Sequence, residues 1–208
     1  MNWFRRRARS GALDEKTAAG IGLALNEASL LGAEYDHATN RFSATFSVLT
    51  LPDDDSPPPT DPRRQLLFND VGRILASLRN AHWDEFSAEP VLFEISELRS
   101  VVESFGGQPV YGGEFINAKD RALKRWEKKP SLDVRPARGS FDNRLMLFQE
   151  AGVTRHLDLW VWFSGVEVFD SSGEPIALSE FIEGAGRWWD ALHERDPRTD
   201  GHGIQPLD

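Results

Sequence analysis

The sequence predicts an α+β protein in which an antiparallel or mixed β-sheet is covered by two to three helices. The first observation behind this prediction is that several segments alternate between apolar and polar residues, as strands with one buried face do. The second is that no segment repeats the strand–helix–strand order of a doubly wound parallel sheet.

The composition indicates one folded domain. The chain has 208 residues, of which 40% are hydrophobic, and this is enough to form a core without metals or disulfides. We expect residues 14–208 to form a single α+β domain. Residues 1–13 contain four arginines, and we expect them to form a flexible basic arm.

The first half begins with a predicted helix over residues 14–26, which has acidic residues in its first turn. Two strands are expected next, over 29–35 and 41–51, because apolar and polar residues alternate in the second of them. Residues 53–62 are rich in proline and aspartate and therefore predict a surface loop.

Residues 66–79 are apolar at both ends and interrupted by Asn69, Asp70 and Gly72, which predicts one long bent strand or two strands in sequence. The clearest helix is expected over 96–105. Ser96 is its predicted N-cap, and four apolar residues with helical spacing form one stripe: Leu98, Val101, Val102 and Phe105. A glycine pair ends this helix, and a short strand over 109–116 follows.

The second half opens with a charged helix or loop over 119–129 and a connector over 130–140. Three apolar segments predict strands, over 144–149, 156–163 and 166–169. The last helix is expected to start at Ser179, with Gly184 and Gly186 either bending it or admitting another backbone.

The order of elements is similar in residues 27–117 and 130–194, so two related halves are a second interpretation. Leu67–Val71 parallels Trp162–Val166, and Ser96–Leu98 parallels Ser179–Phe181. Independent reuse of strand–helix units in α+β proteins would give the same pattern.

Charge and motifs exclude several classes of protein. The formal net charge is -9, so we expect no affinity for nucleic acid, whose binding requires neutralised phosphates. There is no cysteine, which favours a cytoplasmic location. No stretch predicts an export signal or membrane span, and the excess of arginine over lysine is typical of a bacterial source.

The nucleotide-binding, nucleophile-elbow and zinc-helix motifs are absent, and we expect no cofactor, metal or catalytic residue.

The first candidate site is the strand over 156–163. Alternation places His156, Asp158, Trp160 and Trp162 on one face. Two indoles beside an imidazole and a carboxylate could form a stacking platform or a partner-binding surface. The other interpretation is that helices cover this face and the tryptophans belong to the core.

Two weaker candidates lie elsewhere. In the last helix, Asp190 and His193 are three residues apart beside Arg187, and such a pair could bind a metal or exchange protons. Tyr111 lies in a glycine-rich segment that could shape a ligand loop. Solvated charges and simple chain reversal are the more common explanations of these patterns.

Three functional hypotheses follow. The first is a non-catalytic cytosolic interaction protein, of regulatory or immunity type, that binds a basic protein partner through its acidic surface. The second is a metal-dependent or glycan-acting hydrolase that uses the face of His156 and Asp158 or the region of His193. The third is a structural subunit whose tryptophans are buried only in a larger assembly.

Overall fold

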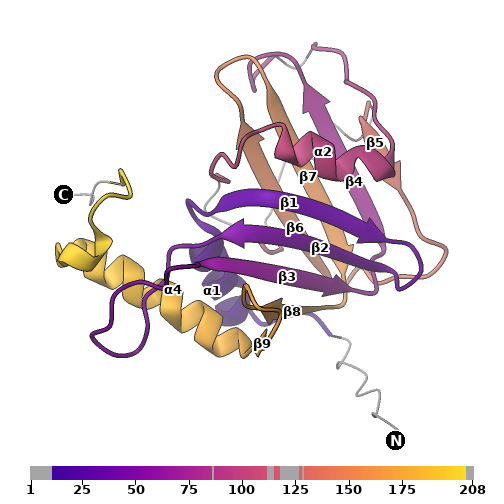
Figure 1. Cartoon of the computed structure of the whole chain (residues 1–208). Helices are drawn as coiled ribbons and strands as arrows, with labels where there is room; N and C mark the ends of the chain where they lie inside the picture. The colour runs from indigo at the N-terminus through magenta and orange to yellow at the C-terminus, as the bar shows by residue number, and fades with distance from the viewer. Residues whose placement is uncertain (1–10, 86, 112–114, 118–126, 128, 205–208) are drawn as a thin grey trace, which may run out of the picture.

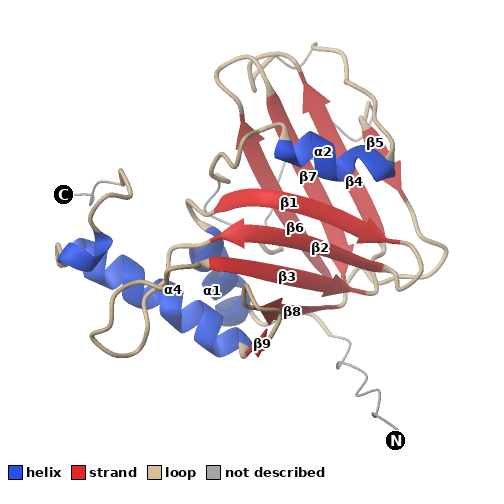
Figure 2. Ribbon diagram, in the orientation of Figure 1, coloured by secondary structure: helices blue, strands red, loops and turns tan. Residues whose placement is uncertain are grey.

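The computed structural model describes residues 11–85, 87–111, 115–117, 127 and 129–204, and these form an α+β fold with two antiparallel sheets and three helices (Figures 1 and 2). The five-stranded sheet contains, in order, β1 (Ser29–Asp36), β2 (Arg41–Ser47), β3 (Arg63–Asn69), β8 (Gly165–Phe169) and β9 (Pro175–Ile176). The four-stranded sheet contains, in order, β5 (Leu132–Val134), β4 (Arg73–Arg79), β7 (His156–Phe163) and β6 (Asn143–Glu150). The predicted fold class is therefore confirmed, with the strands divided between two sheets.

Two chain segments pass from one sheet into the other. β3 continues into β4, and β7 continues into β8. The two segments also pair with each other in both sheets, because β3 is antiparallel to β8 and β4 is antiparallel to β7. The strands of the two sheets cross steeply as a result (Figure 1), which is the arrangement in which bent strands form the corners of a sandwich.

The bends of these two segments lie side by side. Asp70 adopts a positive φ of 51°, and the backbone N–H of Ser164 donates to the carbonyl of Asn69 over 2.9 Å. The Ser164 hydroxyl also donates to the Asp70 carboxylate. The two segments of similar sequence, Leu67–Val71 and Trp162–Val166, thus lie next to each other at the corner of the sandwich. A common origin of the two halves stays a prediction.

One core fills the space between the sheets and is closed by the helices. α1 (Glu15–Leu25) and α4 (Leu178–His193) pack against each other at one end, while α2 (Leu98–Glu103) lies beside β1 (Figure 2). Most of the buried side chains come from the facing sides of both sheets and from all three helices; the largest in this core are Phe42, Phe46, Phe68, Phe115, Phe163, Ile21, Leu25 and Leu30.

A strand-like segment after β2 is held against α4. The N–H of Leu51 donates to the carbonyl of Gly184 over 3.0 Å, and Arg187 Nε donates to the carbonyl of Leu51. A Cβ on Gly184 would overlap Oγ1 of Thr50, whereas a Cβ on Gly186 would meet nothing within 4 Å. Of the two predicted roles for these glycines, close approach of another backbone therefore applies at Gly184.

Some predicted boundaries are wrong. The helix expected over 96–105 is a 3₁₀ turn, Ile95–Glu97, followed by α2, and Ser96 lies inside the turn instead of capping it. The Glu97 carboxylate accepts the N–H of Glu94 instead. The connector over 130–140 contains β5, and β9 was not predicted. Between 109 and 116, only isolated bridges occur in the described residues.

Part of the sequence prediction lies outside the described residues: most of the basic arm, and the charged segment from 119 to 126. The described end of the predicted arm is attached to the domain. Asn143 accepts the N–H of Leu13 over 2.8 Å and donates to the carbonyl of Gly11.

Candidate functional site

The first candidate face is the side of the four-stranded sheet that points away from the five-stranded sheet. The predicted alternation is confirmed, since Leu157, Leu159, Val161 and Phe163 belong to the shared core. His156, Asp158, Trp160 and Trp162 lie on the opposite face. In the neighbouring strand β4 they face, respectively, Arg79, Ser77, Leu75 and Arg73.

Trp160 is fully buried within the single chain. Its side chain is 0% exposed and packs with Leu75, Met146 and Trp162 in a small second cluster. An exposed stacking platform at Trp160 is therefore not what the structure shows. The idea that this indole is buried only in an assembly is wrong for the same reason.

A buried polar cluster adjoins this indole. The His156 imidazole is 1% exposed, its Nδ1 lies 3.1 Å from the carbonyl of Ala81, and its Nε2 lies 3.9 Å from the Asp158 carboxylate. Arg79 is also 1% exposed and donates to the carbonyl of Lys129 over 2.6 Å and to the hydroxyl of Ser131.

Burial dominates the electrostatics of this cluster. It lowers the pKa of His156, and it lowers the pKa of Arg79 although the negative charge of Asp158 acts in the other direction. The arrangement favours a neutral imidazole beside a desolvated guanidinium. The hydrogen bonds of His156 and Arg79 link the loop that follows β4 with the loop that precedes β5.

A half-buried ion network lies at the other end of the same face. Arg73 donates to Asp133 from Nε over 2.8 Å and to Glu127 from Nη1 over 2.8 Å, and its guanidinium lies 5.3 Å from the centre of the Trp162 ring. Hydrogen bonding to Asp133 raises the pKa of Arg73. Burial raises the pKa of Asp133, but hydrogen bonds from Arg73 and Arg135 together bring it below its ordinary value.

The second candidate, in α4, is not brought together as predicted. Arg187 donates from Nη2 to Glu180 over 2.6 Å and from Nε to the carbonyl of Leu51. His193 Nδ1 lies 2.7 Å from the carbonyl of Trp189, and no bond between His193 and Asp190 occurs in the described part of α4. In the described residues, no group of three His, Asp or Glu side chains is placed to hold a metal ion.

Tyr111 is anchored through its backbone. Its N–H donates to the carbonyl of Phe148 over 3.0 Å, and its side chain is 41% exposed. The glycines that follow it lie outside the described residues.

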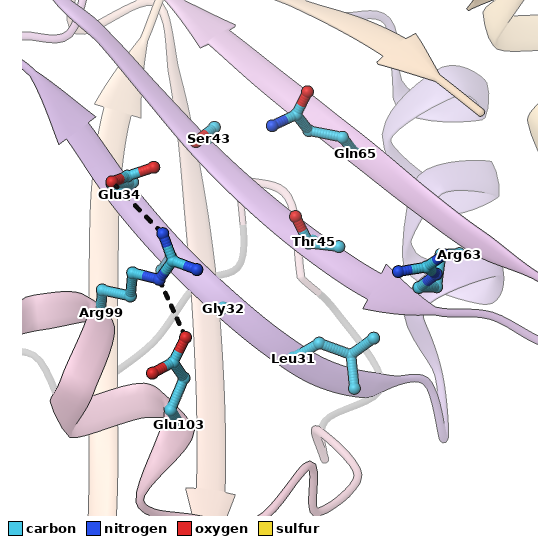
Figure 3. A pocket seen from close by; sticks show the side chains of 10 residues that line it. Leu31, Gly32, Glu34, Ser43, Thr45, Arg63, Gln65, Arg99 and Glu103 are labelled. Atoms are coloured by element: carbon cyan, nitrogen blue, oxygen red, sulfur yellow. Dashed lines mark hydrogen bonds and ion pairs between the residues drawn. The ribbon is translucent and has the colours of Figure 1, made fainter. Parts of the chain in front are cut away.

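A polar groove that the sequence did not predict crosses the outward face of β1, β2 and β3 (Figure 3). It encloses about 320 Å³ and adjoins a second hollow of about 540 Å³. The polar groove is lined by Gly32, Glu34, Ser43, Thr45, Arg63, Gln65, Arg99 and Glu103, with backbone and apolar atoms of Leu31 and Ala33.

Helix α2 supplies one wall of the polar groove. Arg99 Nε donates to Glu103 over 2.9 Å, and Arg99 Nη1 lies 3.9 Å from the Glu34 carboxylate on β1 (Figure 3). At the other end, Arg63 is paired with Asp61. In the sequence, the groove residues have the pattern of the solvent-facing sides of a half-buried strand and of an amphipathic helix. No local pattern shows that the strand surface and the helix surface lie next to each other, so the groove could not be predicted.

A concentration of acidic residues covers the part of the molecule formed by α4, the loop after β2, and strand β8 with the turn that follows it. Three arginines there are each already paired with a carboxylate, in the pairs Arg63–Asp61, Arg187–Glu180 and Arg198–Asp196. Six exposed carboxylates form no salt bridge with any described residue, and we call them the acidic end: Asp53, Asp54, Asp55, Glu167, Glu174 and Glu183.

The acidic end is continuous across three elements. Arg198 Nη1 donates to the carbonyl of Asp54, which joins the loop after β2 to the segment that follows α4. Leu51 is bonded to α4 at Gly184, one residue from Glu183. Ser171 lies close enough to Asp61 to contribute to its lowered pKa, which places the same loop beside the β8–β9 turn.

No helix in the described part of the chain is both long and apolar enough to cross a bilayer. Comparison of the chain with protein-family models, curated proteins and solved structures finds no match.

Proposed function

We propose that this chain is a non-catalytic cytosolic interaction protein that binds a basic protein partner through the acidic end. The observation that carries the proposal is a set of six exposed carboxylates that form no salt bridge with any described residue and lie on α4, the loop after β2, β8 and the β8–β9 turn. Three arginines at this end, Arg63, Arg187 and Arg198, are already paired with other carboxylates, and Arg64 is partly buried, so the exposed charge is predominantly negative.

A field of one sign on one end of a protein attracts a partner of opposite sign and orients it during encounter. The end is also rigid, because α4 is anchored to α1 and to the segment around Leu51. A preformed surface loses little conformational entropy when it binds, which favours recognition of a folded partner over an unfolded chain.

The test uses two charge-reversal variants with the same change in net charge. Glu174→Lys/Glu183→Lys alters the acidic end, and Glu85→Lys/Asp142→Lys alters exposed carboxylates outside it. Each protein is immobilised and exposed to lysate of the source organism, and any retained protein is identified, purified and measured in solution. We expect a 1:1 complex with a protein of positive net charge whose affinity falls as salt rises.

The acidic-end variant should weaken this complex by about tenfold or more, whereas the matched control should change it by less than about twofold. Equal weakening by both variants would show that only total charge matters. Retention of no basic protein, or full retention by the acidic-end variant, would exclude the proposal.

A further inference from the structure

The polar groove on β1, β2 and β3 has unused hydrogen-bonding groups on its floor. The hydroxyls of Ser43 and Thr45 and the amide of Gln65 form no side-chain hydrogen bond with any described residue. A hydroxyl and an amide can each both donate and accept. The floor therefore presents donors and acceptors on two neighbouring strands, with Thr45 opposite Gln65 and Ser43 two residues away along β2 (Figure 3).

The charges around the floor nearly balance, with two arginines against three carboxylates. Arg99 lies between the carboxylates of Glu103 and Glu34, and Arg63 is paired with Asp61. The Arg99 guanidinium has five N–H donors, and Glu103 uses the one on Nε, so donors and carboxylate oxygens remain together at the wall. An anion would have to compete with these carboxylates, whereas a neutral ligand with many hydroxyls can bond to both signs of charge at once.

Gly32 leaves the space above the floor open. It lies at a register shift of β1 and has no positive φ, and a Cβ there would meet nothing within 4 Å, so packing does not require glycine at this position. Gly32 is the direct cross-strand partner of Thr45. Its missing side chain keeps the Thr45 hydroxyl accessible from the groove.

We propose that the polar groove binds a neutral polyhydroxylated ligand, a linear oligosaccharide, laid across β1, β2 and β3. The volume, with its adjoining hollow, is within the range of small-molecule sites. The floor is held in register by the sheet and the wall by α2, so the site is formed before the ligand arrives. This site is separate from the acidic end and does not depend on the function proposed for it.

The test is a titration of ¹⁵N-labelled full-length protein, followed by NMR, with maltopentaose, cellopentaose and chitopentaose. Inorganic phosphate and a polar, uncharged peptide serve as probes of the other ligand classes. We expect at least one saccharide to shift the backbone amides around Gly32, Ser43 and Thr45 at concentrations up to about 10 mM. No shift with any saccharide, shifts confined to other surfaces, or binding of phosphate or peptide alone would overturn the proposal.

Three variants test the location. Gly32→Val fills the groove without removing a hydrogen-bonding group and should weaken binding by about tenfold or more while the protein stays folded. Ser43→Ala should weaken binding by about fivefold, because it removes one hydrogen bond. Ser47→Val is the matched control on the same face of β2 but outside the groove lining, and it should leave binding unchanged. Unchanged affinity in Gly32→Val would reject the site even if a saccharide binds.

Discussion

Arg73 joins β4 to β5 and to the segment that precedes β5, on the outward face of the four-stranded sheet. Its side chain is 8% exposed, and it bonds to Asp133, which precedes Val134 at the sheet edge, and to Glu127. A charge this far from water is tolerated because Asp133 meets it with two parallel hydrogen bonds, over 2.8 and 2.9 Å.

We therefore expect Arg73→Met to lower the free energy of unfolding by about 3 kcal/mol, because it leaves the half-buried Asp133 carboxylate with only the exposed Arg135 as a partner. Arg63→Met is the control. It breaks an exposed pair and should cost less than about 1 kcal/mol. Urea unfolding monitored by circular dichroism measures both, and equal losses in the two variants would contradict this account.

Protonation of His156 makes the free energy of unfolding depend on pH in a different range from that of Asp133. Burial lowers its pKa in the folded protein, so below about pH 6.5 the unfolded chain binds a proton that the native state does not. The free energy of unfolding should fall as the pH decreases through this range. The contribution of Asp133, whose pKa is also lowered, is lost only as the pH falls below about 4.

The measurement is urea unfolding at steps from about pH 7.5 to 5. His156→Gln should reduce the decline over this range, whereas His37→Gln, at an exposed position, should keep the decline of the wild-type protein. An undiminished decline in His156→Gln would assign the pH dependence to other groups.

The sequence could predict on which face of β7 each side chain lies, but not whether that face is covered. The period of two is a local property of the strand and fixes the alternation from His156 to Phe163. Burial of Trp160 depends on Leu75 and Met146, which are distant in sequence and unmarked by any motif. The same limit explains why the polar groove was missed, since Arg99 and Thr45 meet only through the packing of α2 on β1.

Helix α4 contains two glycines with opposite roles, and they form a matched pair for experiment. Gly186→Ala adds a methyl group into open space and should stabilise the protein by about 1 kcal/mol through helix propensity. Gly184→Ala should destabilise it by about 1 to 2 kcal/mol, because its Cβ would push Thr50 away from the helix. Thermal unfolding should show shifts of opposite sign, and shifts of the same sign would contradict the close approach.

Elements with a strong local pattern were predictable, and elements made by long-range pairing were not. The alternation in 41–47 and the acidic start of α1 are visible in sequence, and both elements are confirmed. The break between β3 and β4 was visible as Asn69, Asp70 and Gly72, but one bent strand and two strands fit it equally. Only pairing with β7 and β8 decides that the chain changes sheet there.

The molecule should unfold as one unit, because the strand pair β3–β4 and β7–β8 belongs to both sheets. Neither sheet can open without breaking a segment of the other. We expect native-state hydrogen exchange to give the amides of Leu66 in the five-stranded sheet and Leu159 in the four-stranded sheet opening free energies equal within about 1 kcal/mol. A much lower value for either sheet would show two independent units.

The corner at Asn69 and Ser164 also determines when the protein can fold during its synthesis. β1, β2 and β3 leave the ribosome early, but β8, which pairs with the other edge of β3, ends only at Phe169. At typical elongation rates, the open edge of β3 waits on the order of 5 to 20 s for that partner. We therefore expect a chaperone, or the loops next to β3 in the nascent chain, to cover this edge of β3 until translation is nearly complete.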